Sequence, residues 1–122
     1  MIHKDLDVYK ESMLLIKDIF DLTRQFPKEE LFSLTAQMRR ASYSIPCNIA
    51  EGAGRKSRRE LLQFLNIALG SLIELETQLD IAKMLGFSKN DEFNQQIEKR
   101  HLKVKQLLLA MIKSLTADEA RR

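Results

Sequence analysis

The residues best suited to chemistry in this 122-residue sequence are cations near its middle. Residues 35–60 contain six cations and two acids, a net charge of +4, whereas the whole chain carries +3. Lys and Arg side chains neutralise phosphates, and the N-terminus of a following helix adds a further positive end. This stretch therefore predicts a polyanion-binding site, although a solvated turn would have the same composition. The six candidate residues are Arg39, Arg40, Arg55, Lys56, Arg58 and Arg59.

Two of these cations, Arg39 and Arg40, are adjacent in a predicted helix, so they point about 100° apart. One can therefore serve the basic patch while the other pairs with an acid such as Glu74 or Glu76. The sequence leaves open which of them faces the patch. No aromatic residue lies between residues 45 and 60, so binding is expected to be mainly electrostatic, with weak sequence preference.

Sequence patterns of known catalytic sites are absent. The sequence has no glycine-rich phosphate loop, no nucleophile elbow and no HExxH helix. Glu98 and His101 have the Glu-x-x-His spacing of di-metal carboxylate bundles, but those sites need a second copy and inward glutamates from other helices. We expect His101 to be a core residue and His3 to lie near a mobile end. The sequence thus predicts a protein that is not an enzyme and holds no metal or cofactor.

The composition is typical of a helical bundle. Hydrophobic residues make up 44% of the sequence and charged residues 30%, with four Gly and two Pro, which predicts a single domain over residues 1–122. No apolar run approaches the roughly 20 residues needed to cross a bilayer. The N-terminus lacks the apolar region of a signal peptide, so a cytoplasmic location is expected. The single cysteine, Cys47, is interpreted as a small packed residue.

Hydrophobic periodicity predicts four long helices. The first should start near Asp5 or Asp7 and stop before Pro27. Two adjacent apolar stripes run along it and predict a wide buried face. One stripe is Leu6, Tyr9, Met13, Ile16 and Phe20, and the other is Val8, Leu15, Ile19, Leu22 and Phe26.

The second helix is expected from about Leu31 or Ser33 to Gly52 and Gly54. Its predicted inward positions are Leu34, Met38, Ala41, Ile45 and Ile49.

The third helix should be capped by Ser57 with Glu60 and closed by Gly86, a length of roughly 25 residues. Its heptad seam is the strongest periodic signal in the chain. The seam residues are Leu61, Leu65, Ala68, Leu72, Leu75, Leu79 and Ala82. The fourth helix should be capped by Asn90 or Asp91, with the inward positions Ile97, His101, Val104, Leu108, Met111 and Leu115.

Short connections between these helices predict an all-α, antiparallel, up-down-up-down four-helix bundle. Several apolar positions lie off the seams, and exposed contiguous apolar area usually marks a protein interface. We therefore expect self-association, with a wider core in one chain as the alternative. The off-seam residues are Phe64, Ile67 and Ile73 on the third helix and Val8 and Leu15 on the first.

Motifs along nearly the whole chain give it a family resemblance. The motifs are DLDVY at residues 5–9, LTAQMRRA at 34–41, SIPCNIAEG at 44–52, FLNIALGSL at 64–72 and ELETQL at 74–79. With them the sequence resembles the bacterial four-helix-bundle proteins encoded in intervening sequences of 23S ribosomal RNA genes, and the related accessory proteins of diversity-generating retroelements. Cys47 departs from the serine that is more usual there.

The resemblance implies a ring-like homopentamer with no known catalytic activity. In the retroelement relatives, basic surfaces of such a ring engage nucleic acid and a reverse transcriptase. The leading hypothesis is a non-enzymatic, oligomeric bundle that binds RNA or DNA electrostatically through its basic surfaces. The alternative is an assembly scaffold that binds a protein partner, such as a reverse transcriptase, without a direct nucleic-acid function.

Overall fold

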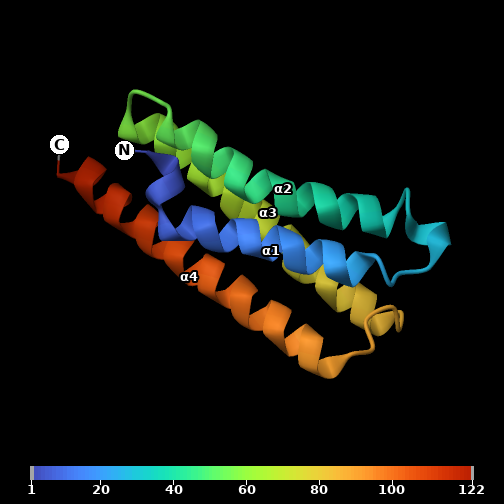
Figure 1. The fold of residues 1–122 in the computed structure, drawn as a ribbon. Coiled ribbons are helices and arrows are strands. Elements are labelled where there is room, and N and C mark those ends of the chain that lie inside the picture. Colours follow the sequence, from blue (N-terminus) through green and yellow to red (C-terminus); the bar gives the residue numbers. More distant parts are fainter. Residues whose placement is uncertain (1, 122) are drawn as a thin grey trace.

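Four long helices make up most of the computed structural model, which describes residues 2–121 (Figure 1). Short 3-10 turns at His3–Asp5 and Lys28–Glu30 precede the first two helices. No strand occurs within residues 2–121, so the all-α prediction is confirmed. The helices are α1 (Asp7–Thr23), α2 (Leu34–Ala53), α3 (Arg58–Met84) and α4 (Asp91–Ala120).

Successive helices run in opposite directions, as predicted for an up-down-up-down bundle (Figure 1). The α2–α3 turn lies at the same end of the bundle as the two chain ends, and the other two connections lie at the opposite end. Each helix packs against its two neighbours, and the α1–α4 contact closes the circle. In residues 2–121 the diagonal pairs α1–α3 and α2–α4 do not approach each other.

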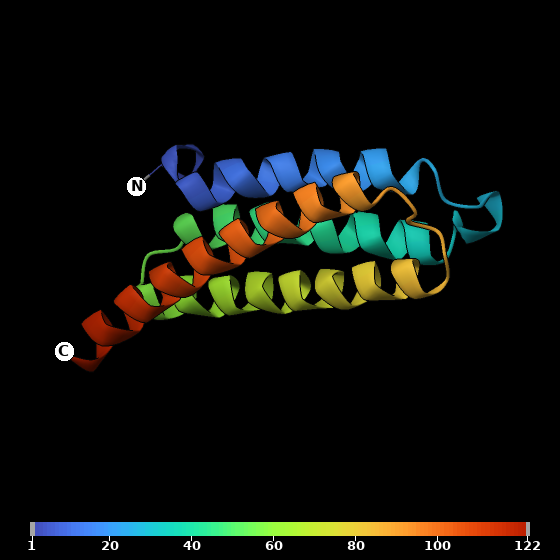
Figure 2. The same ribbon diagram turned by 90° about the horizontal axis from the view of Figure 1, so that it is seen from below.

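The predicted seams of α2, α3 and α4 form the core. All five inward positions of α2 are buried, and so are the α3 seam residues from Leu65 to Ala82. The α4 seam is buried from Ile97 to Leu108, while Met111 and Leu115 are only half-buried. Figure 2 shows why: α4 crosses the bundle at an angle, and its C-terminal end extends beyond the start of α3.

Only one of the two stripes on α1 faces the core. Val8, Leu15, Ile19, Leu22 and Phe26 are buried. The other stripe lies toward the edge of the helix–helix contacts, and its Met13 is 45% exposed. The expectation that Val8 and Leu15 contribute to a self-association surface is therefore wrong, because the core covers both.

Local capping signals begin α3 and α4 and close α3 where predicted, whereas α1 and α2 begin without a side-chain cap. The Ser57 hydroxyl accepts the Glu60 N–H at 3.2 Å, and the Asn90 carboxamide accepts the Phe93 N–H at 3.0 Å. Gly86 adopts a φ of 77° after α3, a left-handed conformation that favours glycine. Each cap satisfies backbone groups that a helix end leaves free.

Two further expectations concern single residues and membrane crossing. Cys47 is exposed on α2 rather than packed, because it lies on the outer side of the helix between the buried Ile45 and Ile49. Within residues 2–121, none of the helices has the length and apolar character that crossing a bilayer requires.

Candidate nucleic-acid interface

The α2–α3 turn is positioned by a close approach of its two helices at Gly52. A Cβ atom on Gly52 would lie 2.9 Å from Phe64 Cβ and 3.0 Å from Leu61 Cδ1. Only glycine fits this contact without movement of α3. Gly54 then caps α2 by donating its N–H to the carbonyls of Ala50 and Glu51. The turn residues 54–57 are thereby presented at the end of the bundle (Figure 1).

One of the four cations at the α2–α3 turn, Arg55, is held by the protein itself. Its guanidinium forms an ion pair with Glu51, one helical turn earlier. The same group lies over the ring of Phe64, with 4.9 Å between Arg55 Cζ and the ring centroid. Arg55 is therefore partly neutralised and fixed in place, which leaves it less able than its neighbours to meet a phosphate.

The other three cations at the turn are exposed. Lys56, Arg58 and Arg59 have no hydrogen-bond or ion-pair partner in residues 2–121. Arg58 and Arg59 begin α3, so their charges add to the positive end of its helix dipole. Glu60 follows in the same first turn and offsets one of these charges. We refer to Lys56, Arg58 and Arg59 as the turn cations.

The remaining candidates, Arg39 and Arg40, lie far from the turn. Ala53 lies fourteen positions after Arg39 in α2, a rise of about 21 Å at 1.5 Å per residue. Neither arginine therefore joins the turn cations in one compact patch. The six cations that cluster in the sequence are therefore divided between the two ends of α2.

Arg39 and Arg40 also differ from each other. Arg39 faces α1, where its Nε donates to Thr23 Oγ1 at 3.0 Å. Arg40 is exposed and shares a recess with Glu74 of α3. In the described part of the chain neither arginine forms an ion pair with Glu74 or Glu76, and Glu76 instead pairs with Lys105 at 3.5 Å.

Phe64 is the residue of this region that sequence reasoning missed. The basic stretch contains no aromatic residue, but the fold brings Phe64 from α3 beneath Arg55. Phe64 is half-buried, and the Arg55 guanidinium lies over one face of its ring. The seven-residue step from Ser57 to Phe64 is the signal that could have placed this ring near the turn, two helical turns after the cap.

The off-seam apolar residues of α3 do not form one stripe. Phe64 is half-buried, whereas Ile67 and Ile73 are 51% and 48% exposed. Ile67 and Ile73 are six residues apart, which places them about 120° apart around the helix. They therefore belong to two different surfaces of the bundle.

The Glu-x-x-His pattern on α4 serves packing in this fold. His101 is 5% exposed, and its Nε2 lies 2.7 Å from the carbonyl oxygen of Leu72 on α3. This confirms the interpretation of His101 as a core residue. Glu98 pairs with Lys83 at the surface. The two side chains therefore have separate protein partners.

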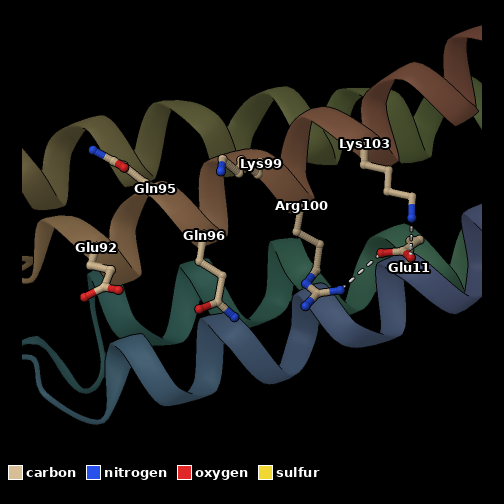
Figure 3. A pocket seen from close by; sticks show the side chains of 7 residues that line it. All are labelled: Glu11, Glu92, Gln95, Gln96, Lys99, Arg100 and Lys103. Carbon is tan, nitrogen blue, oxygen red and sulfur yellow. Dashed lines mark hydrogen bonds and ion pairs between the residues drawn. The ribbon is translucent and has the colours of Figure 1, made fainter.

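A polar groove of about 570 Å³ lies between α1 and α4 (Figure 3). Arg100 spans it, donating from Nε to Asp18 at 2.6 Å and from Nη1 to Glu11 at 3.1 Å. Lys103 donates to the other oxygen of Glu11 at 2.9 Å. These charged groups satisfy one another, so the network joins α1 to α4 rather than presenting an unpaired reactive group.

The network shifts the pKa of two of its members. The hydrogen bond from Lys103, helped by Arg100, lowers the pKa of Glu11 despite the opposing effect of burial. Burial disfavours the charged form of Arg100, but the hydrogen bonds and charges of Asp18 and Glu11 outweigh it and raise the pKa of Arg100. Both residues therefore stay charged around neutral pH.

Comparison with known proteins identifies the family. A crystal structure from Bacteroides thetaiotaomicron, described as a protein of unknown function from the S23 ribosomal protein family, is similar to this chain with a TM-score of 0.79 and 25% sequence identity. The similarity covers 93% of this chain and 99% of that one. No match was found among curated proteins. The family model of the 23S rRNA-intervening sequence protein matches residues 4–110, so the chain belongs to that family.

Proposed function

We propose that this protein is a non-enzymatic, oligomeric bundle that binds RNA or DNA through the α2–α3 turn, in the cytoplasm. The observation that carries the proposal is the exposure of Lys56, Arg58 and Arg59 without any partner in residues 2–121. Side chains without an intramolecular partner can neutralise phosphates without first breaking an ion pair. The turn also projects from the end of the bundle, where a nucleic acid can approach it (Figure 1).

The number of free cations sets the expected salt dependence. Each phosphate contact releases condensed counterions, so the slope of log affinity against log salt is about −0.9 per contact for duplex DNA. Three contacts per protomer give a slope of about −2.7. Arg55 adds little to this slope because Glu51 already neutralises it. The ring of Phe64 near the turn lies under Arg55, so that face of the ring is not free to stack on a base.

A salt titration with matched variants tests this proposal. Binding to duplex DNA and to a structured RNA is measured by fluorescence anisotropy over a series of salt concentrations. The test variant replaces Lys56, Arg58 and Arg59 by alanine. The control variant replaces three other exposed lysines by alanine. These lysines have no partner in residues 2–121 and lie away from the turn: Lys10, Lys89 and Lys99. Both variants lose the same net charge, so only the position of the charge differs.

The proposal predicts that the turn variant loses most of the salt dependence, whereas the control keeps a slope close to that of the parent. Equal losses in the two variants would show that binding depends on net charge alone and would refute the assignment of the turn. A parent protein that binds neither nucleic acid at low salt would refute the function.

Self-association is part of the proposed function. Exposed Ile67 and Ile73 on two different sides of α3 are suited to contacts with two neighbouring copies, and the family resemblance favours a ring of five. Native mass spectrometry tests this: a pentamer is expected, and a monomer at micromolar concentration would contradict it. Each ring would repeat the turn cations and multiply the salt slope.

A scaffold that binds a protein partner is the second candidate. The observation in its favour is Phe32, which is 93% exposed beside the 48% exposed Leu31 in the α1–α2 connection. Such an aromatic side chain is a suitable anchor for a protein interface. If Phe32→Ser abolishes capture of a reverse transcriptase encoded near the gene while the turn variant leaves capture intact, the scaffold is the better description.

A further inference from the structure

A recess of about 320 Å³ lies where α1 ends and α2 begins. Its Arg39 lies about 21 Å along α2 from Ala53, where the helix ends near the turn cations. The walls of the recess are mainly apolar, formed by Phe26, Pro27 and Leu31. Three cations reach it and no carboxylate lines it. Apolar walls with a few polar groups are typical of sites for small organic molecules. The cations are Arg24, Lys28 and Arg39.

Arg39 is held in a fixed orientation at this recess. Its Cζ lies 4.3 Å from the centroid of the Phe20 ring, and its Nε donates to Thr23 Oγ1 at 3.0 Å. Thr23 is buried and donates its own proton to the Ile19 carbonyl at 2.7 Å, so its oxygen is oriented to accept from Arg39. These contacts use one face and one N–H of the guanidinium.

The rest of the Arg39 guanidinium has no acceptor among the described residues 2–121. Its two terminal nitrogens make no hydrogen bond or ion pair in residues 2–121. A guanidinium presents its N–H groups as a planar fork that matches a carboxylate or a phosphate. Because ring stacking and the Thr23 contact already fix the side chain, little rotamer freedom is lost when an anion binds.

Thr35 gives an independent indication of a ligand. It lines the recess and is only 3% exposed, yet its hydroxyl has no hydrogen-bond partner in the described chain. The oxygen is not fully enclosed, because Gln78 Oε1 is the one fully buried side-chain oxygen or nitrogen without a partner in residues 2–121. The hydroxyl of Thr35 is therefore free to donate its proton to a ligand in the recess. An oxyanion beside Arg39 would supply the missing acceptor.

The other cations of the recess contribute unequally. Arg24 is already paired with Asp21 at 3.6 Å. Lys28 is exposed and has no partner in residues 2–121, so it can add a second positive charge at the rim. Glu29 and Glu30 follow Lys28 in the 3-10 turn but do not line the recess.

We propose that this recess binds a small organic anion, with a carboxylate or phosphate on Arg39 and Thr35 and an apolar body against Phe26, Pro27 and Leu31. Lys28 assists at the rim. The proposal does not depend on nucleic-acid binding, because the recess and the turn cations share no residue.

Benzoate and phenyl phosphate are suitable probes, since each joins an oxyanion to a small apolar ring. Binding is followed by NMR titration of the amide signals of residues 23–39, at probe concentrations up to about 10 mM, enough to saturate a site with a Kd of about 1 mM. Inorganic phosphate tests the need for the apolar body, and benzyl alcohol tests the need for the charge. We expect both to bind more weakly than the preferred probe, and the ratio between benzoate and phenyl phosphate identifies the oxyanion.

Matched variants locate the anion. Arg39→Gln should weaken binding about tenfold or more, because charge-assisted hydrogen bonds are lost. Arg39→Lys keeps the charge but loses the planar fork, so its affinity for the probe should lie between those of Arg39→Gln and the parent. Thr35→Val should weaken binding by a few-fold. Arg40→Gln removes the same charge from the neighbouring exposed residue and should leave binding unchanged.

Circular dichroism melting curves must first show that each variant is folded. The proposal fails if neither probe shifts these signals, or if Arg39→Gln and Arg40→Gln weaken binding equally. It also fails if benzyl alcohol binds as well as the anions. The turn variant with Lys56, Arg58 and Arg59 replaced should bind the probes like the parent. The anion site can therefore be tested even if the protein does not bind nucleic acid.

Discussion

Replacing Gly52 by alanine tests the packing that positions the α2–α3 turn. The new Cβ would lie 2.9 Å from Phe64 Cβ and 3.0 Å from Leu61 Cδ1. Phe64 Cβ is attached directly to the backbone of α3, so a change of rotamer cannot remove the clash. The two helices must therefore move apart at this point. Gly70 on α3 is the matched control, because a Cβ there meets nothing within 4 Å.

The expected effects of the two substitutions have opposite signs. In an exposed helix interior, replacing glycine by alanine stabilises by about 0.5–1 kcal/mol, and Gly70→Ala should show this gain in full. Gly52→Ala has the same helix gain, but carbon atoms pack at about 3.5–4.0 Å, so the helices must separate by roughly 0.6 Å or more. Overpacking of this kind costs about 1–3 kcal/mol. The middle of these two ranges gives a net loss of about 1 kcal/mol.

Urea unfolding followed by circular dichroism measures both effects. The two variants should differ by the overpacking cost alone, about 1–3 kcal/mol, which is on the order of 1 M in urea midpoint for a slope of about 1–3 kcal/mol/M. Protein concentration must be equal in all samples, because self-association raises apparent stability. If Gly52→Ala is as stable as Gly70→Ala, the close approach of α2 and α3 at this glycine is refuted.

Three further predictions concern single side chains. Ser57→Ala removes the α3 cap and should lower the free energy of unfolding by about 1 kcal/mol, whereas Ser57→Asp should retain the cap. Gln78→Met should raise the free energy of unfolding, measured with urea, by about 1 kcal/mol. The buried Gln78 Oε1 has no hydrogen-bond partner, so the substitution removes an unsatisfied polar atom. Glu11 has a lowered pKa, so its contribution to stability is complete above the ordinary pKa of about 4.3 and disappears as pH falls through the lower folded value. Glu11→Gln should therefore be less stable than the parent at pH 7 and converge with it in acid; a gap that is independent of pH would contradict the ion-pair argument.

Much of the fold could be predicted from the sequence because three helices carry one clear seam each. The heptad from Leu65 to Ala82 leaves a single way to bury α3. On α1 two apolar stripes of similar strength lie side by side, and periodicity alone does not rank them. The choice in favour of Leu15 and Ile19 depends on the angle at which α2 and α4 meet α1, which is a property of the whole bundle.

The candidate site was less predictable because sequence neighbours are not always spatial neighbours. The ion pair of Arg55 with Glu51 follows from helical spacing, but its contact with Phe64 depends on the close approach at Gly52. The direction of Arg39 depends on which α1 side chains lie opposite it. Thr23 is sixteen residues away in the sequence, and no local pattern joins the two.

The circular order of helix contacts bears on how the chain folds. Three of the four contacts join helices that are consecutive in the sequence, so they close short loops and should form quickly. The α1–α4 contact is the exception, since Arg100 and Asp18 are 82 residues apart, and closing so long a loop carries the largest entropic penalty. Substitutions in the Glu11–Asp18–Arg100 network should therefore accelerate unfolding and leave the folding rate almost unchanged, as expected for contacts that form after the rate-limiting step.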